Sequence, residues 1–385
     1  MPSSLASRTL ARLRAIRDAG LERTLRPPSG IDLSSNDYLC LSQHPRLKSA
    51  MADAIAAEGV GSTGSRLLRG DRRALTNVEH QFAEFKGTER ALYFSSGYLA
   101  NLAVLTTLPE KGDLIFSDER NHASLIDAAR LSRAARMIFP HNDTEAIGRP
   151  IAEYSPTGQV FVVTESLFSM DGDIAPLRRH AAMCRVTGAA LIIDEAHAVG
   201  LYGMRGSGLI EAMDLDPNLC ISINTAGKAL GVSGAFVAGP AWAIDYLIQR
   251  ARTFIFSTAP PPAIAAALAA SLDIVLSEPQ RRDHLATQVA YLRAALAAAG
   301  VPIPTDASHI IPIVIGDNDR AMAAAKALQA QGFDVRAIRP PSVAPGSARL
   351  RISVNTGLDN KTLDRFAAAL AGVLKDTPSW SAASS

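Results

Sequence analysis

The chain contains 385 residues, of which 48% are hydrophobic and 20% are charged, a composition that excludes disorder as its main state. This length allows two or three packed units. With 39 Lys and Arg against 37 Asp and Glu, the formal net charge is only +2, so we expect neither nucleic acid nor an anionic membrane as a partner.

Three cysteines provide no disulfide framework and no Cys-x-x-Cys metal site, which is typical of a reducing compartment. The longest apolar run is far shorter than the roughly 20 residues that span a bilayer. The histidines show no zinc-binding spacing, so no metal is expected. We therefore expect a cytoplasmic protein.

The N-terminal residues 1–45 are predicted to form an arm. The first twenty of them are rich in arginine and serine, which also fits an organelle transit peptide. We favour an amphipathic helix for this stretch because its apolar residues recur at helical spacing.

Residues 46–278 show apolar, β-branched runs that alternate with helical periods. This alternation predicts an α/β domain with a mostly parallel sheet and helices on both faces. The predicted strands are 90–94, 113–117, 159–166, 190–195, 220–225 and 234–239. The predicted helices are 46–58, 74–86, 98–107, 122–132, 175–187 and 262–277.

The remaining residues predict a small C-terminal α/β domain, 279–376, and a solvated tail, 377–385. The elements expected in that domain are helix 279–299, strand 309–315, helix 319–331, strands 333–338 and 348–354, and helix 359–374.

Two nucleotide-binding motifs are present only in part. A Gly-x-Gly-x-x-Gly pattern at 59–64 follows a predicted helix, whereas a dinucleotide site needs a strand before it. Lys228 follows a glycine but precedes Ala229, so the hydroxyl of a phosphate-binding P-loop is missing. Neither a nicotinamide nor a nucleoside triphosphate site is predicted.

Polar residues of types common in catalysis follow three of the predicted strands. Asp194 ends one strand, and His197 follows it closely. Lys228 lies in a turn of small residues after another strand, and the Ser-Ser-Gly-Tyr segment 95–98 follows a third. Because ligands bind beyond the carboxyl ends of parallel strands, we expect these residues to face one crevice.

The chemistry of these residues fits pyridoxal phosphate. Lys228 can form a Schiff base with an aldehyde, and Asp194 can keep a pyridine nitrogen protonated. The Ser-Gly turn at a helix N-terminus suits a phosphate, and His122 suits the ring face. Each residue alone has an ordinary structural explanation, such as a surface lysine or a helix cap. Their combination favours the cofactor.

Sequence blocks in a fixed order then show a family resemblance. The chain resembles the α-oxoamine synthases, which condense an amino acid with an acyl thioester and release CO2. The blocks reach from about Ser34 to about Asp376 and include GSTGSRLLRG, SSGYLAN, NHASL, VTESLFSMDGDIAPL, DEAHAVGLYGMRGSG, TAGKALGVSG, STAPPP and IRPPSVAPGSARLRIS. The resemblance implies the aspartate aminotransferase-like fold type I, with a large, mostly parallel seven-stranded sheet and a small α+β C-terminal domain.

The resemblance also implies roles for residues around the cofactor. Lys228 matches the lysine that forms the Schiff base, and Asp194 matches the partner of the pyridine nitrogen. His197 matches the partner of the phenolic oxygen, and His122 matches the histidine stacked on the ring. Glu165 lies near these residues in a role that the resemblance does not define.

Further residues match positions that bind the phosphate or the substrates. The family is homodimeric with a shared active site, and two of these residues would come from the partner subunit. The phosphate and cofactor contacts are Gly97, Tyr98, Ser169 and Thr225, with Ser257 and Thr258 from the partner subunit. The substrate contacts are Arg23, Asn36, His122, Ser342 and Arg351, of which Arg351 would bind the amino-acid carboxylate.

Three segments, LSSNDYLCLSQHP, VTESLFSMDGD and AIRPPSVAPGSARLR, are most similar to the members that use L-alanine. Those members join L-alanine to a pimeloyl group, carried by coenzyme A or by acyl carrier protein, in biotin biosynthesis. The alternatives are a glycine C-acetyltransferase or a serine and long-chain acyl member, a pyridoxal phosphate lyase or aldolase, and a non-catalytic subunit.

Overall fold

A computed structural model describes residues 4–153, 158–306 and 308–375. The chain divides into two compact units. The sheet unit contains residues 36–169 and 173–284. The C-terminal unit contains the residues up to Ser35, 170–172 and those from Leu285 on, so most of the predicted arm groups with it. The predicted tail, 377–385, lies outside the described residues.

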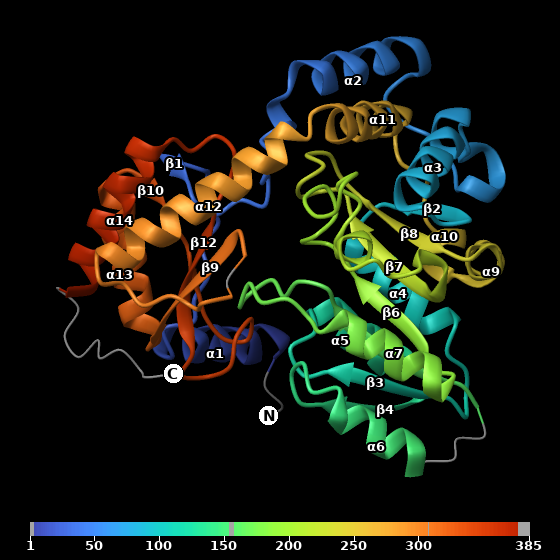
Figure 1. Cartoon of the computed structure of the whole chain (residues 1–385), viewed down its shortest axis with the longest axis horizontal. Coiled ribbons are helices and arrows are strands. Elements are labelled where there is room, and N and C mark those ends of the chain that lie inside the picture. Colours follow the sequence, from blue (N-terminus) through green and yellow to red (C-terminus); the bar gives the residue numbers. More distant parts are fainter. Residues whose placement is uncertain (1–3, 154–157, 307, 376–385) are drawn as a thin grey trace. The chain divides into compact units, whose positions relative to one another are not determined.

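The sheet unit is built on one seven-stranded sheet in the order β2-β8-β7-β6-β5-β3-β4 (Figure 1). Only β8 runs antiparallel to its neighbours, which confirms a mostly parallel sheet. The strands are β2 (Arg90–Phe94), β3 (Leu114–Asp118), β4 (Ala135–Phe139), β5 (Val160–Glu165), β6 (Ala190–Asp194), β7 (Cys220–Thr225) and β8 (Ala235–Gly239).

Strand β8 shows how the sheet packs on both faces. Ala235 and Val237 join a core with helices on one face, while Phe236 between them points to the other face. There Phe236 stacks on Phe82 with 4.1 Å between ring centroids. Phe82 belongs to α3 (Arg73–Lys86), so α3 covers this second face. The first core includes α4 (Gly97–Thr107), α5 (Ala123–Leu131), α9 (Ala241–Arg250) and α10 (Arg252–Ile255).

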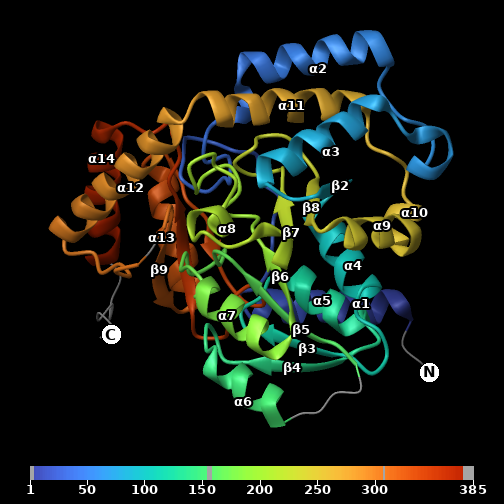
Figure 2. The same cartoon turned by 45° about the vertical axis from the view of Figure 1, so that its right-hand side comes forward.

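The other helices of this unit lie around the sheet. Helices α2 and α3 both pack against α11 (Figure 2). Helix α2 ends directly before the glycine pattern at 59–64, so that pattern follows a helix and not a strand. The bounds are α2 (Pro45–Glu58), α6 (Glu145–Glu153), α7 (Leu177–Thr187), α8 (Leu209–Ala212) and α11 (Pro262–Ser277).

The C-terminal unit contains a three-stranded antiparallel sheet, in the order β11-β12-β9, and a separate parallel pair of β1 and β10. The single strand predicted at 333–338 is therefore wrong, because β10 and β11 belong to different sheets. The elements are α1 (Leu5–Asp18), β1 (Ile31–Asp32), α12 (Gln280–Ala298), β9 (Ile310–Gly316), α13 (Asn318–Ala330), β10 (Phe333–Asp334), β11 (Ala337–Ile338), β12 (Ala348–Ser353) and α14 (Asn360–Lys375). The first residues of α12, before Leu285, belong to the sheet unit.

Within the described residues no single helix is long and apolar enough to cross a bilayer. Helices α11 and α12 reach the required length and composition only as a bent pair.

Candidate active site

The register of the sheet brings the ends of several strands to one edge. Glu165 at the end of β5 pairs with Asp194 at the end of β6. Asp194 in turn pairs with Ile223, two residues before Thr225 ends β7. Strand β2 runs parallel to these strands, because both β2 and β7 are antiparallel to β8. The segments that follow β2, β6 and β7 therefore leave the sheet at the same edge, as expected from the sequence.

Lys228 ends a chain of hydrogen-bonded side chains in this region. Its Nζ lies 2.7 Å from Nε2 of His197, whose Nδ1 lies 2.7 Å from the phenolic oxygen of Tyr38. The Tyr38 hydroxyl donates to Oδ1 of Asn36 at 2.9 Å. Because that hydroxyl has only one proton, its oxygen accepts from Nδ1–H, which leaves Nε2 to accept from Lys228. Asn36, expected to bind substrate, thus helps to fix the tautomer of His197.

A second hydrogen-bonded chain joins Asp194 to His122. The side-chain amide of Asn101 donates to Oδ2 of Asp194 at 2.9 Å and to the hydroxyl of Ser124 at 2.8 Å. The Ser124 hydroxyl lies 2.7 Å from Nδ1 of His122. The other oxygen of Asp194 accepts from the backbone N–H of Ala196 at 2.9 Å. Asp194 is therefore buried but fixed through both carboxylate oxygens.

The surroundings shift the pKa values of two groups beside Lys228. Burial lowers the pKa of His122; Asp194 opposes this shift, and Lys228 strengthens it. Burial and the charge of Asp194 raise the pKa of Glu165 to about 8. Glu165 also accepts the backbone N–H of His122 at 2.6 Å. Glu165, whose role the sequence left undefined, therefore holds the backbone at His122.

The start of α4 fits a phosphate group. A methyl group added at Gly97 would lie only 2.6 Å from Oγ1 of Thr225, so the glycine lets this hydroxyl approach the first helical turn. Ser96 caps the helix by accepting from the N–H of Leu99 at 3.2 Å. The N–H groups of Gly97 and Tyr98 lie in that first turn, where backbone donors commonly bind anions. Together with Lys228 and Asp194, this turn fits a phosphorylated aldehyde with a basic ring nitrogen.

The other predicted cofactor contacts have different surroundings. Ser257 and Thr258 line a small cavity, about 20 Å³, together with Ser95 of the same chain. Thr258 also pairs with Ser65 across an isolated β-bridge. Ser169 lies in the loop after β5, which closes through the bridge between Leu167 and Ile174. Its predicted contact with the cofactor stays a prediction.

A charged histidine, His141, contacts the loop that follows β5. His141 lies 3.0 Å from Asp118 through Nδ1 and 2.7 Å from Asp173 through Nε2. Burial alone would lower its pKa, but the two aspartates outweigh that effect and raise the pKa to about 9. His141 is therefore a cation at neutral pH and links the end of β3 to the loop.

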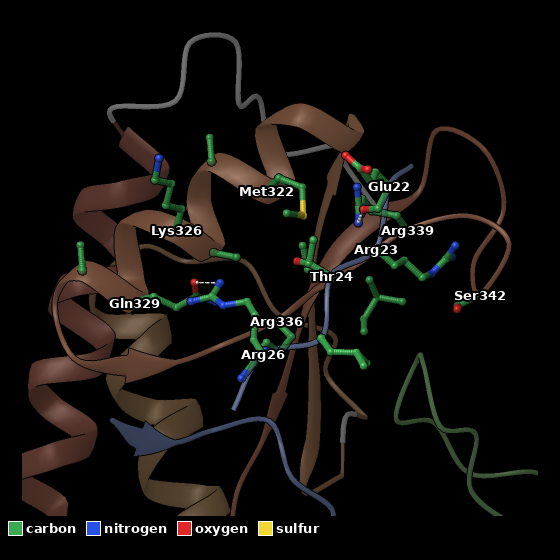
Figure 3. A pocket seen from close by; sticks show the side chains of 16 residues that line it. Glu22, Arg23, Thr24, Arg26, Met322, Lys326, Gln329, Arg336, Arg339 and Ser342 are labelled. Carbon is green, nitrogen blue, oxygen red and sulfur yellow. Dashed lines mark hydrogen bonds between the residues drawn. The ribbon is translucent and has the colours of Figure 1, made fainter. Parts of the chain in front are cut away.

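Three predicted substrate contacts belong to the C-terminal unit. Arg351 is buried on β12, where its Nη1 donates to the hydroxyl of Ser353 at 2.8 Å. Arg23 and Ser342 line one cavity of about 950 Å³ although they are far apart in the sequence (Figure 3). Arg23 donates to the backbone oxygen of Pro340 at 2.9 Å, which links the arm to the segment that carries Ser342.

Three buried residues of the site with polar groups were not predicted from the sequence, namely Tyr38, Asn101 and Ser124. A signal existed for Asn101, because it follows Gly97 by four residues and so shares a helix face with the phosphate turn. Among the described residues, no group of three or more His, Cys, Asp or Glu side chains is placed to hold a metal ion.

Comparisons with known proteins identify the family of the chain. The family model described as aminotransferase class I and II matches residues 28–370. The 8-amino-7-oxononanoate synthase of Anaeromyxobacter dehalogenans is 45% identical over 382 residues, which covers 96% of each chain. That of Burkholderia pseudomallei is 46% identical and covers 94% of this chain and 93% of its own.

Two solved structures are also similar. Serine palmitoyltransferase from S. paucimobilis superposes with a TM-score of 0.90 at 26% identity, over 97% of this chain and 99% of its own. The 8-amino-7-oxononanoate synthase of Francisella tularensis gives a TM-score of 0.78 at 30% identity, over 90% and 98% of the two chains. These matches confirm the family resemblance and the fold class predicted from the sequence. The chain therefore belongs to the aminotransferase class I and II family and, within it, to the α-oxoamine synthases, in the branch of its 8-amino-7-oxononanoate synthase relatives.

Proposed function

We propose that the chain binds pyridoxal phosphate and condenses L-alanine with a pimeloyl thioester, giving 8-amino-7-oxononanoate, CO2 and a free thiol for biotin biosynthesis. The observation that carries this proposal is Lys228 Nζ, held 2.7 Å from His197 at the sheet edge where Asp194 is buried. The names of the relatives support the choice of reaction, and a solved relative was determined with this cofactor bound.

When bound, pyridoxal phosphate supplies an aldehyde that condenses with amines and a protonated ring that accepts electrons from the substrate Cα. Asp194 holds the ring proton, because a carboxylate in a site of low dielectric binds a cation strongly. Asn101 keeps Asp194 in position through its amide. The first turn of α4 and Thr225 bind the phosphate.

The remaining residues orient the substrate and move protons. Lys228 in its neutral form takes the proton from Cα of L-alanine, and the lone pair of His197 Nε2 holds Lys228 at the correct place. His122 stays neutral because burial lowers its pKa, so it can donate a hydrogen bond to the acyl carbonyl. The planar guanidinium of Arg351 binds the carboxylate of L-alanine through two parallel hydrogen bonds.

We further infer that the protein acts as a homodimer in the cytoplasm. Exposed apolar side chains near Ser257 and Thr258 support a second copy as the partner, namely Leu67, Leu68 and Phe256. In this assembly the two hydroxyls would complete the phosphate site of the partner subunit. The location is supported by the three cysteines, none of which forms a disulfide.

A second candidate function is the same condensation, at the same site, with a different amino acid or acyl chain. The structural likeness to serine palmitoyltransferase, at a TM-score of 0.90, favours it. The identity of 45% to 8-amino-7-oxononanoate synthase, against 26% for the palmitoyltransferase, favours L-alanine and a pimeloyl group.

A thiol-release assay separates these functions. L-alanine, glycine and L-serine are each combined with pimeloyl, acetyl and palmitoyl coenzyme A. We expect thiol release and CO2 only from L-alanine with the pimeloyl donor, and product with another pair would replace the proposal. Lys228→Ala should abolish turnover and the absorbance of the Schiff base, whereas Lys48→Ala on the exposed part of α2 should change neither. An unchanged spectrum in Lys228→Ala would refute the role of this lysine.

A further inference from the structure

Residues 226–234 connect β7 to β8 and include Lys228, and we call them the lysine segment. Their backbone forms a tight turn, because the N–H of Gly231 donates to the oxygen of Lys228 at 2.8 Å. Ala229 and Leu230, which follow the lysine, are buried. The backbone next to Lys228 is therefore enclosed by the protein, and its oxygen atoms need hydrogen-bond donors there.

Ser271 supplies one such donor. It lies on α11 among apolar residues, it is 0% exposed, and its hydroxyl donates to the backbone oxygen of Leu230 at 2.7 Å. A serine inside a helix commonly donates to the backbone oxygen four positions earlier. Ser277 of the same helix does so, at 2.6 Å from the oxygen of Asp273. Ser271 instead binds a residue 41 positions away, so its hydroxyl serves the lysine segment and not its own helix.

Tyr93 of β2 binds the other end of the lysine segment. Its hydroxyl donates to the backbone oxygen of Ser233 at 2.9 Å, and its buried ring lies edge-on to Phe236 with 5.3 Å between ring centroids. Burial raises the pKa of Tyr93 to about 12, so the hydroxyl keeps its proton at neutral pH. A methyl group added at Gly234, where φ is +83°, would overlap this hydroxyl. The glycine therefore lets the tyrosine reach the segment.

The position of Tyr93 is itself fixed by a buried ion pair. Strand β2 lies at the edge of the sheet, and the backbone N–H of Tyr93 donates to Oε1 of Glu79 at 2.8 Å instead of to another strand. Arg66 binds both oxygens of Glu79, at 2.8 and 3.0 Å. Each side chain of this bidentate pair is only 10% exposed. The tyrosine hydroxyl is thus held in one place when it donates to the lysine segment.

We propose that Tyr93 and Ser271 are positioning residues for Lys228, which hold the backbone of the lysine segment so that Nζ stays beside His197 whether or not the lysine is bonded to the cofactor. The proposal rests on the proposed function, in which Lys228 both attaches the cofactor and takes the proton from Cα. The flexible stem of a lysine cannot fix its amine, so the backbone has to be held. A displacement of about 1 Å at a reacting group can lower a rate about 100-fold.

Each contact can be removed by deleting a single oxygen atom, in Ser271→Ala and in Tyr93→Phe. The matched controls are Ser277→Ala on the same helix and Tyr246→Phe, a tyrosine that is 37% exposed. Hydrogen exchange of the cofactor-free enzyme, followed by mass spectrometry, measures the protection of the lysine segment. We expect exchange about tenfold faster there in both test variants, because each loses one hydrogen bond that closes the segment. The controls should exchange like the wild type.

Titration of the cofactor-free enzyme with pyridoxal phosphate, followed by the absorbance of the Schiff base, adds a second readout. The Kd should rise about three- to tenfold in the test variants. In the loaded enzyme kcat should fall about tenfold at unchanged KM for L-alanine, since the binding of its carboxylate does not involve either hydroxyl. The controls should keep the values of the wild type.

A lower Tm with unchanged Kd and kcat would show that the two hydroxyls only stabilise the fold, and would overturn the proposal. Exchange that rises equally throughout the sheet unit, or equally in the controls, would overturn it as well. Each variant tests its own contact, so if one fails to fold the other still decides. If the wild type released no thiol from any substrate pair, the proposed function would fail, while hydrogen exchange and the titration would still test the positioning of Lys228.

Discussion

Lys86 and Glu195 form an ion pair inside the sheet unit, with side chains that are 1% and 0% exposed. Lys86 also donates to the backbone oxygen of Ser207 at 2.6 Å, and Glu195 accepts the N–H of Leu209 at 2.6 Å. The pair joins the last residue of α3 to the residue that follows Asp194. The expected effect of breaking it therefore concerns both stability and the site.

Lys86→Met should destabilise the protein by about 3–5 kcal/mol, because it leaves the carboxylate of Glu195 buried without its counterion. For a unit of roughly 250 residues this corresponds to a fall in Tm of about 6–20 °C. Thermal unfolding followed by far-ultraviolet circular dichroism measures the shift. Adding Glu195→Gln should recover part of it, since the neutral amide needs no counterion.

The matched control is Arg90→Met, which breaks the ion pair with Asp245 at the surface. These side chains are 41% and 55% exposed, so the change should cost less than about 1 kcal/mol, or a few degrees in Tm. If Lys86→Met lowers Tm no more than Arg90→Met does, the buried carboxylate of Glu195 does not need Lys86 as its counterion.

Three further predictions concern polar contacts. His141 has a pKa of about 9 in the folded protein, above its ordinary value near 6.5, so its roughly 3 kcal/mol of stabilisation is fully present below about pH 6.5 and is lost as the pH rises through 9. His141→Asn should remove this dependence from a series of Tm measurements, and parallel curves for both proteins would contradict it. Tyr38→Phe removes the hydroxyl that accepts a hydrogen bond from Nδ1 of His197, the residue that contacts Lys228. The pH profile of kcat/KM should therefore shift, whereas superimposable profiles would exclude Tyr38 from positioning the base. Asn101→Leu removes one hydrogen bond to Asp194 and should lower kcat about 10–100-fold at similar KM, and an unchanged kcat would show that Asp194 needs no such support.

The sequence predicts most of the sheet because strands buried on both faces are continuous apolar runs. Strand β4 was missed because it is not buried in this way. It lies at the edge of the sheet, and four of its five residues, Ala135 to Ile138, are exposed. An edge strand that is exposed over most of its length, with Arg136 as its second residue, has no burial pattern to reveal it. The run 333–338 was predicted as one strand because it is a mostly apolar stretch, whereas it forms two short strands that pair with different partners.

The candidate site divides along a similar line. Lys228 and Asp194 could be predicted because both lie at or just after the ends of predicted strands. The carboxyl ends of parallel strands meet at one edge of a sheet in any such fold. The contact of Asn101 with Asp194 could not, because it joins a helix face to a strand end across 93 positions. The common cavity of Arg23 and Ser342 depends on the folding of the whole C-terminal unit. Local sequence patterns contain no information on contacts between residues that are far apart in the chain.

The reversed direction of β8 has a consequence for Lys228. Because β8 returns beside β7, the lysine segment is a short connection between two neighbouring strands instead of a long crossover. The bond from the N–H of Ala226 to the oxygen of Gly234 closes this connection at its base, at 2.8 Å. The backbone under the lysine thus takes its shape when the sheet assembles, and the entropy of ordering it is lost during folding and not during each encounter with a ligand.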